Sequence, residues 1–257
     1  LVGSDFIAKG RMNKLAAWLN VLDEQVMKSH PTITSLKASI AVNKGNPQDG
    51  LIYFDKLVNS LQSTQQIELL ADNLVRRSST RRLLGDYQGA IEDADQAIEL
   101  CTGREKFSLI LAEAMRAKGS TLFQQGKWKD SLHWLQQSLN IYQSCHRDQD
   151  IARIQVEIGA AADALGDFKQ AEKAYQDSLR YWQSVGDSMW QANLLNNLGV
   201  LQHSVGEYEL AFSNLEKALQ YASLNGNLRM EGYSLASIGD LYRDLEAYPE
   251  AEDVYQK

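Results

Sequence analysis

The sequence predicts an all-α fold built from helical hairpins that repeat roughly every 40 residues. Three observations lead to this prediction. Apolar residues recur at spacings of three and four along the chain, which is the period of one helix face. Short turns interrupt these runs at nearly constant intervals. Small residues keep fixed distances from each turn, which indicates helices that pack closely against each other.

The stretch 194–219 contains the repeating unit in its clearest form. Two apolar runs at helical spacing flank one turn, so this stretch is predicted to form an antiparallel hairpin. Gly206 suits the left-handed backbone that ends a helix, and Glu207 suits the first turn of the next helix, where the N-terminal partial charge favours an anion. The apolar residues of the two runs are Leu194, Leu198, Leu201, Val205, Tyr208, Ala211, Leu215, Ala218 and Leu219.

The same turn recurs along the whole chain at nearly equal separations. The first residues of the turns are Gly45, Gly85, Gly126, Gly166, Gly206 and Glu246. At a fixed distance before each turn stands a small residue, in order Ala38, Ser78, Gly119, Gly159, Gly199 and Gly239. At a fixed distance after each turn stands another, in order Gly50, Ala90, Ser131, Ala171, Ala211 and Ala251. Accidental spacing in a helical bundle would not keep this register.

Prolines and glycines mark the ends of the expected hairpins. Pro31 and Pro47 suit first helical positions, where a missing N–H costs nothing, and Gly103, Gly186 and Gly226 suit the turns between hairpins. The expected hairpins are residues 31–62, 64–100, 104–145, 147–184 and 187–224, followed by an incomplete one at 227–257.

A partial first hairpin is expected over residues 1–30, with a turn at Gly10. Its apolar residues are Phe6, Ile7, Leu15, Trp18, Leu19 and Leu22. Because each hairpin of a repeat array buries its apolar face against its neighbours, we expect one domain over residues 1–257. The chain begins without Met and ends inside an expected helix, so we expect it to be a fragment of a larger protein.

The succession of a small residue, a glycine turn, an aromatic residue and a later Ala or Ser resembles the tetratricopeptide repeat. The usual repeat is about 34 residues long, and here it is extended to roughly 40. This resemblance implies a right-handed α-α superhelix whose first helices line a concave groove.

Composition narrows the classes of partner. The 257 residues are 44% hydrophobic, with 33 acidic and 26 basic side chains, and the basic residues form no continuous stripe. Direct contact with nucleic acid by this segment is therefore not expected. No apolar run is long enough to span a membrane, so we expect a cytoplasmic protein. Cys101 and Cys145 lack metal-binding spacing, so we expect them to be free thiols.

Several motifs between Gly10 and Tyr87 resemble the repeat arm of MalT-type, LuxR-like bacterial transcriptional activators. They are Gly10, Trp18-Leu19, Leu22, Pro31, Gly45, Arg76-Arg77-Ser78 and Arg81-Arg82-Leu83-Leu84-Gly85-Asp86-Tyr87. The resemblance implies an arm that senses an effector, in a polypeptide that also carries an ATPase module and a DNA-binding domain. This chain contains no glycine-rich phosphate-binding loop.

The groove implied by the tetratricopeptide resemblance gives the candidate ligand-binding residues. They are Glu113, Arg116, Phe123, Arg153, Asn193, Asn196, Asn197, His203, Tyr233 and Arg243. The three asparagines lie in one helix at a cost of roughly 1 to 2 kcal/mol relative to alanine, and their amides could bind a peptide backbone or sugar hydroxyls. Leu195-Asn196-Asn197-Leu198 also resembles the peptide-binding repeats of kinesin light chains. The alternative is that one asparagine bonds to the neighbouring hairpin while the others are exposed.

Two further groups of side chains have competing interpretations. The arginines Arg76, Arg77, Arg81 and Arg82 could contact an anion or another domain. Alternatively they pair with the acidic residues Glu92, Asp93 and Asp95 on the antiparallel helix. Trp18 and Trp128 are expected in the core, because one lies on an apolar stripe and the other at the aromatic turn position.

The sequence contains no spacing typical of a catalytic triad, a metal site or paired catalytic carboxylates. We therefore expect no enzymatic activity and no cofactor. The function expected is an effector-sensing and protein-interaction domain of a bacterial transcriptional activator, with a peptide, a protein or a small polar effector as ligand. Two alternatives remain open: a free-standing peptide-binding adaptor, and the regulatory half of an enzyme whose catalytic domain lies elsewhere.

Overall fold

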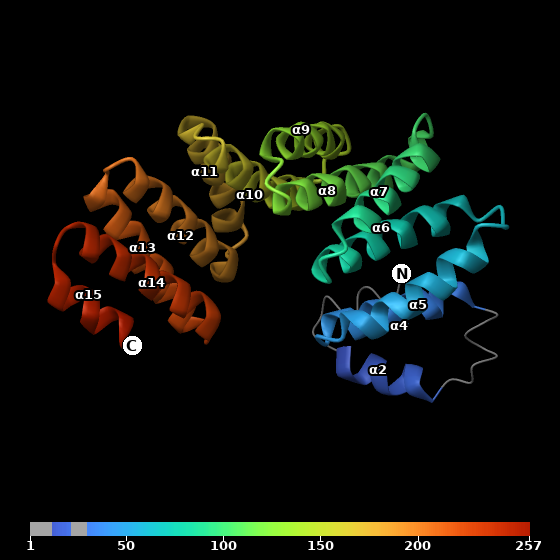
Figure 1. Ribbon diagram of the computed structural model, residues 1–257, viewed down its shortest axis with the longest axis horizontal. Helices are drawn as coiled ribbons and strands as arrows, with labels where there is room; N and C mark the ends of the chain where they lie inside the picture. The colour runs from blue at the N-terminus through green and yellow to red at the C-terminus, as the bar shows by residue number, and fades with distance from the viewer. Residues whose placement is uncertain (1–11, 22–29) are drawn as a thin grey trace. The chain divides into compact units, whose positions relative to one another are not determined.

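The computed structural model describes residues 12–21 and 30–257, and none of these residues lies in a β-strand. The chain separates into two compact units, Leu1–Ile141 (unit 1) and Tyr142–Lys257 (unit 2), with the boundary inside helix α9 (Trp128–Ser144). Each unit consists of successive helical hairpins (Figure 1). The all-α repeat predicted from the sequence is therefore confirmed.

Unit 1 contains the hairpins of the first half of the chain. Its other helices are α2 (Met12–Asn20), α4 (Pro31–Asn43), α5 (Pro47–Leu61), α6 (Ile67–Leu83), α7 (Tyr87–Cys101), the 3-10 turn η1 (Glu105–Phe107) and α8 (Ser108–Gln124). The helices α4 and α5 form one hairpin and α6 and α7 the next, and α6 also packs on α8 and α4.

Unit 2 repeats one pattern three times. Its helices are α10 (Asp148–Ala164), α11 (Phe168–Ser184), α12 (Ser188–Ser204), α13 (Tyr208–Leu224), α14 (Leu228–Asp244) and α15 (Tyr248–Tyr255). The two helices of each hairpin pack on each other, and α12 also packs on α14 of the next hairpin. Each second helix packs in turn on the first helix that follows it.

The turns have the left-handed backbone that the glycines predicted. The glycine at each turn has a φ between 62° and 85°, and the only non-glycine residues with positive φ in the described ranges are His146 (51°) and Glu246 (60°). Asp86 and Asp167 cap the helices that follow, each accepting a hydrogen bond from a backbone N–H three residues later. Glu207 precedes its helix as the N-cap residue but makes no such bond. Its longer side chain therefore does not replace the aspartate cap.

The small residues mark the closest approach of the two helices of a hairpin. A Cβ added at Gly199 would lie 2.6 Å from Cγ of Leu215 and 3.1 Å from the carbonyl oxygen of Ala211. At the equivalent place in unit 1, Ser78 Oγ donates to the carbonyl oxygen of Ala90 at 2.7 Å. Glycine in one hairpin and serine in another therefore both serve this close contact.

Two expectations about tryptophans are wrong. Trp18 is 59% exposed, because α2 faces α4 through Leu15 and Leu19 instead. Trp128 is 41% exposed, because the aromatic turn position lies at the start of a second helix, where only part of the ring is covered. The remaining residues named for the partial first hairpin, Phe6, Ile7, Gly10 and Leu22, lie outside the described residues.

Both cysteines are free thiols, as predicted. Burial raises the pKa of the Cys101 thiol to about 11, which opposes formation of the reactive thiolate. No helix in the described ranges is long and apolar enough to cross a membrane.

Candidate functional site

A groove of about 450 Å³ lies in unit 1, lined mainly by α4, α6 and α8, the first helices of three successive hairpins. Its apolar lining consists of Val42, Phe54, Val75, Leu83, Leu109 and Ile110. Its polar lining consists of Ser39, Asn43, Asp72, Arg76, Ser79, Thr80, Glu113 and Arg116. A cavity of this size, lined by both apolar and polar side chains, is a candidate ligand site.

Two arginine–carboxylate pairs fix the charges of this unit 1 groove. Arg76 Nε lies 2.8 Å from Asp72 Oδ2, and Arg76 Nη1 donates to Ser39 Oγ of the preceding hairpin at 3.3 Å. Arg116 Nη2 lies 2.9 Å from Glu113 Oε2. All four charged side chains are partly exposed. The groove therefore offers two cations and two anions at defined places beside apolar walls.

The sequence-predicted residues are only partly brought together here. Glu113 and Arg116 line the unit 1 groove, whereas Phe123 of the same helix does not. Asp72 was not predicted, although it stands as far before the turn at Gly85 as Glu113 stands before the turn at Gly126. The repeat register could therefore have found it.

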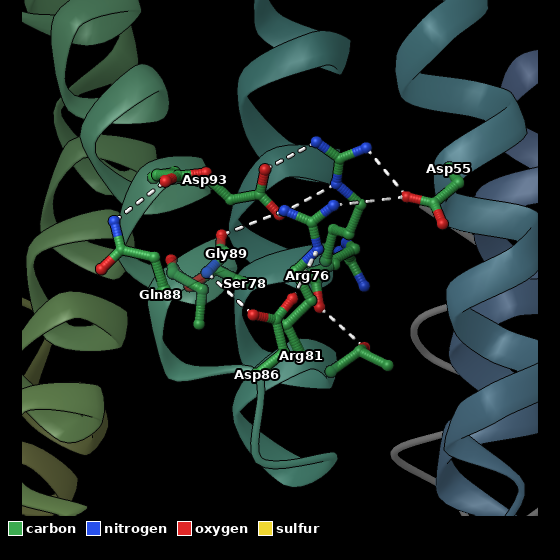
Figure 2. Close-up of polar contacts among 12 residues, drawn as sticks. Asp55, Arg76, Ser78, Arg81, Asp86, Gln88, Gly89 and Asp93 are labelled. Atoms are coloured by element: carbon green, nitrogen blue, oxygen red, sulfur yellow. Dashed lines mark hydrogen bonds and ion pairs between the residues drawn. The ribbon is translucent and has the colours of Figure 1, made fainter. Parts of the chain in front are cut away.

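Three of the four arginines of α6 divide between the unit 1 groove and a group of carboxylates. Arg76 faces the unit 1 groove, while Arg77 and Arg81 lie among carboxylates of the neighbouring helices α5 and α7 (Figure 2). Arg77 binds Asp93 with Nε at 2.9 Å and Nη2 at 2.6 Å, and it binds Asp55 with Nη1 at 3.0 Å. Arg81 lies 3.2 Å from Asp93. Arg82 is partly buried.

Burial and ion pairing act in opposite directions in this charge network, which we define as Asp55, Arg77, Arg81 and Asp93. Burial raises the pKa of the Asp93 carboxyl, whose side chain is only 3% exposed, while Arg77 and Arg81 act in the opposite direction. For Arg77, burial lowers the pKa, but hydrogen bonds and charges from Asp93 and Asp55 outweigh it and raise the pKa. The network joins α5 of one hairpin to α6 and α7 of the next.

Pairing of the arginines with the antiparallel helix was predicted for Asp93 and is observed there. The other two acidic residues of that prediction have different partners. Glu92 accepts a hydrogen bond from Gln88 of its own helix, and Asp95 pairs with Lys118 of α8 at 2.6 Å. Asp55 was not predicted, because it lies on the preceding hairpin and no local spacing connects it to α6.

The asparagines proposed as ligand contacts lie on α12 of unit 2. Asn193 Nδ2 lies 4.0 Å from Sδ of Met230 on α14, which matches the alternative that one asparagine bonds to the neighbouring hairpin. Asn196 is only 8% exposed, and its Oδ1 has no hydrogen-bond partner among the described residues. Asn197 is partly buried. Asn196 is therefore the least accessible of the three.

Most of the other predicted residues of unit 2 have partners in the protein. The Arg153 guanidinium lies 6.0 Å from the ring centre of Trp190. His203 Nε2 lies 3.0 Å from Asp244 Oδ2 of the next hairpin. Arg243 pairs with Asp240 at 2.7 Å and with Asp244 at 3.1 Å.

Tyr233 is half exposed, and its hydroxyl accepts a hydrogen bond from Arg229 at 3.0 Å. In the described part of the chain, no group of three or more His, Cys, Asp or Glu residues is arranged to hold a metal ion.

Known proteins support this description of the fold. The tetratricopeptide repeat family matches residues 69–144 and 150–223, which is more than half of the chain. A comparison of the sequence with curated proteins finds no match.

Three solved structures resemble the chain at low sequence identity. A Signal Transduction ATPase with Numerous Domains from Pyrococcus horikoshii, which has a tetratricopeptide repeat sensor, has a TM-score of 0.74 and 16% identity, over 87% of this chain and 35% of its own. A Rap protein complexed with Competence and Sporulation Factor has a TM-score of 0.71 and 13% identity, over 96% and 78%. BtubC from P. vanneervenii has a TM-score of 0.62 and 19% identity, over 88% and 89%.

At these identities the likeness concerns the fold alone. The family match, the repeat register and the hairpins agree with one another. The chain belongs to the tetratricopeptide repeat family.

Proposed function

We propose that this chain is a non-catalytic sensing and protein-interaction module, and that the unit 1 groove binds an extended peptide. The observation that carries the proposal is the composition of this groove. Apolar side chains, mainly from three first helices, stand beside two arginine–carboxylate pairs, two serines, a threonine and an asparagine. These groups suit apolar side chains, charged side chains and backbone amides at the same time.

The charges of the unit 1 groove favour a peptide over a nucleic acid. Asp72 and Glu113 neutralise Arg76 and Arg116, and the chain has a net charge of −7. A polyanion would therefore meet no excess of positive charge in the groove. A peptide with both acidic and basic side chains can form ion pairs with the arginine and the carboxylate of each pair. The spacing of the charges along the peptide therefore determines which peptides bind.

Binding in this groove can regulate the protein without chemistry. The lining comes from three hairpins, and Arg76 already bridges two of them through Ser39. A ligand that spans α4, α6 and α8 favours the hairpin angles that suit it. A ligand shifts the equilibrium between two arrangements of the hairpins only by the difference between its binding free energies for them. A difference of about 1 to 3 kcal/mol is typical.

The finer proposal is that the module is the effector-sensing arm of a MalT-type bacterial transcriptional activator in the cytoplasm. The motifs around Arg76 to Tyr87 support it. Two similar structures are a Signal Transduction ATPase with a tetratricopeptide repeat sensor and a Rap protein complexed with Competence and Sporulation Factor. The unit 2 residues named from the sequence remain a separate proposal and are not contacts of the peptide in the unit 1 groove. They are Arg153, Asn193, Asn196, Asn197, His203, Tyr233 and Arg243.

The test is affinity selection of random octapeptides on the whole chain, with mass spectrometry to identify the bound peptides and fluorescence anisotropy to measure their Kd. Octapeptides are too short to form a stable helix, so they sample extended ligands. The groove variant carries Arg76→Ala and Arg116→Ala. We expect it to bind the selected peptides at least tenfold more weakly than the parent.

Arg180→Ala is the matched control. Arg180 pairs with Asp177 three residues earlier, as Arg116 pairs with Glu113, but it lies on α11 of unit 2. We expect this variant to bind the peptides within twofold of the parent. Equal binding by the parent and the groove variant would contradict the assignment of the groove.

A further inference from the structure

One edge of unit 2 exposes apolar side chains in a regular pattern. The turns that join α10 to α11, α12 to α13 and α14 to α15 each expose an aliphatic residue just before the turn position and an aromatic residue two positions after it. These side chains are 39 to 61% exposed, and we call them the turn edge. They are Leu165, Phe168, Val205, Tyr208, Leu245 and Tyr248.

The turn edge is hollowed between its first two turns. A cavity of about 530 Å³ lies there, with Phe168 and Lys169 on one side and Leu201 and Val205 on the other. Leu201 is buried and forms an apolar floor, while Val205 and Phe168 are exposed at the rim. An apolar side chain of a partner could therefore be inserted between two successive turns.

Exposed glutamates accompany the second and third of these turns. Glu207, Glu209, Glu246 and Glu250 are exposed and form no ion pair with any residue of the described ranges. The basic residues beside the turns are Lys169 and Arg243, and Arg243 is already bound to Asp240 and Asp244. The potential along the turn edge is therefore negative.

The equivalent turns of unit 1 lack this pattern. At the position of Glu207 they carry Asn46, Asp86 and Lys127, and Lys44 and Lys129 lie nearby. Unit 1 therefore places basic as well as acidic residues at these turns, whereas the exposed glutamates without an ion pair lie in unit 2.

We propose that the turn edge of unit 2 docks a basic, amphipathic segment of a partner protein. Exposed apolar side chains in a row, rimmed by polar residues, mark an interaction surface. Lysine and arginine side chains of such a segment would meet the free glutamates, which gives complementarity and faster association. The same glutamates repel nucleic acid and anionic membranes. This surface shares no residue with the unit 1 groove, so the proposal is independent of the proposed function.

The experiment is selection of phage-displayed random 16-residue peptides on the whole chain, after removal of phage that bind the charge-reversed variant Glu207→Lys/Glu209→Lys. The apolar variant Leu165→Ser/Val205→Ser tests the other component of the surface. We expect selected peptides that combine Lys or Arg with Leu, Phe or Trp. Their Kd should rise at least tenfold for each of the two variants.

The control is Glu99→Lys/Glu216→Lys, which makes the same charge change on exposed residues of α7 and α13 away from the turns. This control should bind within twofold of the parent, and circular dichroism should give equal helicity for all variants. Three outcomes would overturn the proposal: acidic or uncharged selected peptides, equal binding by the turn variants, or no peptide that distinguishes the parent from them.

Discussion

Helix α6 of unit 1 and helix α12 of unit 2 occupy the same place in their hairpins, but α6 buries polar side chains where α12 buries apolar residues. At four equivalent positions of the repeat, α6 carries polar residues and α12 carries three leucines and a glycine. The pairs are Asn73 and Leu194, Arg77 and Leu198, Ser78 and Gly199, and Thr80 and Leu201. All eight residues are buried. The hairpin therefore does not require one kind of interior.

The buried side chains of the two helices are stabilised by different kinds of contact. In α6 the amide of Asn73 and the hydroxyl of Thr80 donate to backbone carbonyls one turn earlier, and Arg77 binds Asp93 and Asp55. In α12 the three leucines pack in a cluster with Tyr175 and Trp182. We infer that α6 is sensitive to the loss of one polar partner, whereas α12 is sensitive to a change in volume.

The largest effect is expected from Asp93→Ala, because it leaves the buried Arg77 guanidinium with only Asp55 as a close partner. Breaking a buried ion pair from one side lowers the free energy of unfolding by about 3 to 5 kcal/mol. Asn214 occupies the equivalent position in unit 2 and donates to Gln202. Asn214→Ala should cost only about 1 kcal/mol.

Urea denaturation followed by circular dichroism measures both variants. Similar losses for Asp93→Ala and Asn214→Ala would show that the charge network of α6 contributes no more than an ordinary hydrogen bond.

Gly199→Ala is expected to have the next largest effect. The added methyl group would lie 2.6 Å from Leu215 Cγ and 3.1 Å from a backbone oxygen, so the two helices must separate or Leu215 must move. We expect a loss of about 1 to 3 kcal/mol, although alanine is the better helix former. Gly199→Leu should cost at least as much.

Ser78→Ala is the matched change in α6. It keeps the volume near that of serine and removes only the hydrogen bond to Ala90, so about 1 kcal/mol should be lost. A Gly199→Ala variant as stable as the parent in thermal denaturation would mean that α12 and α13 have room to move apart.

The smallest effect concerns the turns. Glu246 has a φ of 60° where the equivalent residue Gly206 has 83°. A left-handed conformation costs a non-glycine residue about 1 to 2 kcal/mol, so Glu246→Gly should stabilise unit 2 by about 1 kcal/mol. Gly206→Ala should destabilise it by a similar amount. Unchanged melting temperatures for both variants would contradict this explanation of the repeated glycines.

The sequence predicted the hairpins well because their determinants are local. Gly206 provides the left-handed backbone of one turn, and Gly199 allows close contact within one hairpin. Both residues lie where the repeat register predicted them. Interactions between hairpins were harder to predict. Asp55 lies 22 residues before Arg77, and its contact depends on how two hairpins stack. The exposure of Trp128 likewise depends on which part of the turn its neighbours cover.

The candidate site was predicted only in part for the same reason. Glu113 and Arg116 were found from their place on a first helix, but the cavity itself requires α4 and α6 as its other walls. The burial of Asn196 could not be read from its helix face, because the neighbouring hairpins determine how much of that face stays open.

Hydrogen exchange with mass spectrometry tests the central claim, which is that the unit 1 groove is the ligand site. The whole chain is compared with and without an octapeptide selected as described above. We predict slower exchange of backbone amides in α4, α6 and α8 on binding, and unchanged exchange in α12. Protection of α10, α12 and α14 with no change in α4, α6 and α8 would contradict the account and assign the ligand to unit 2.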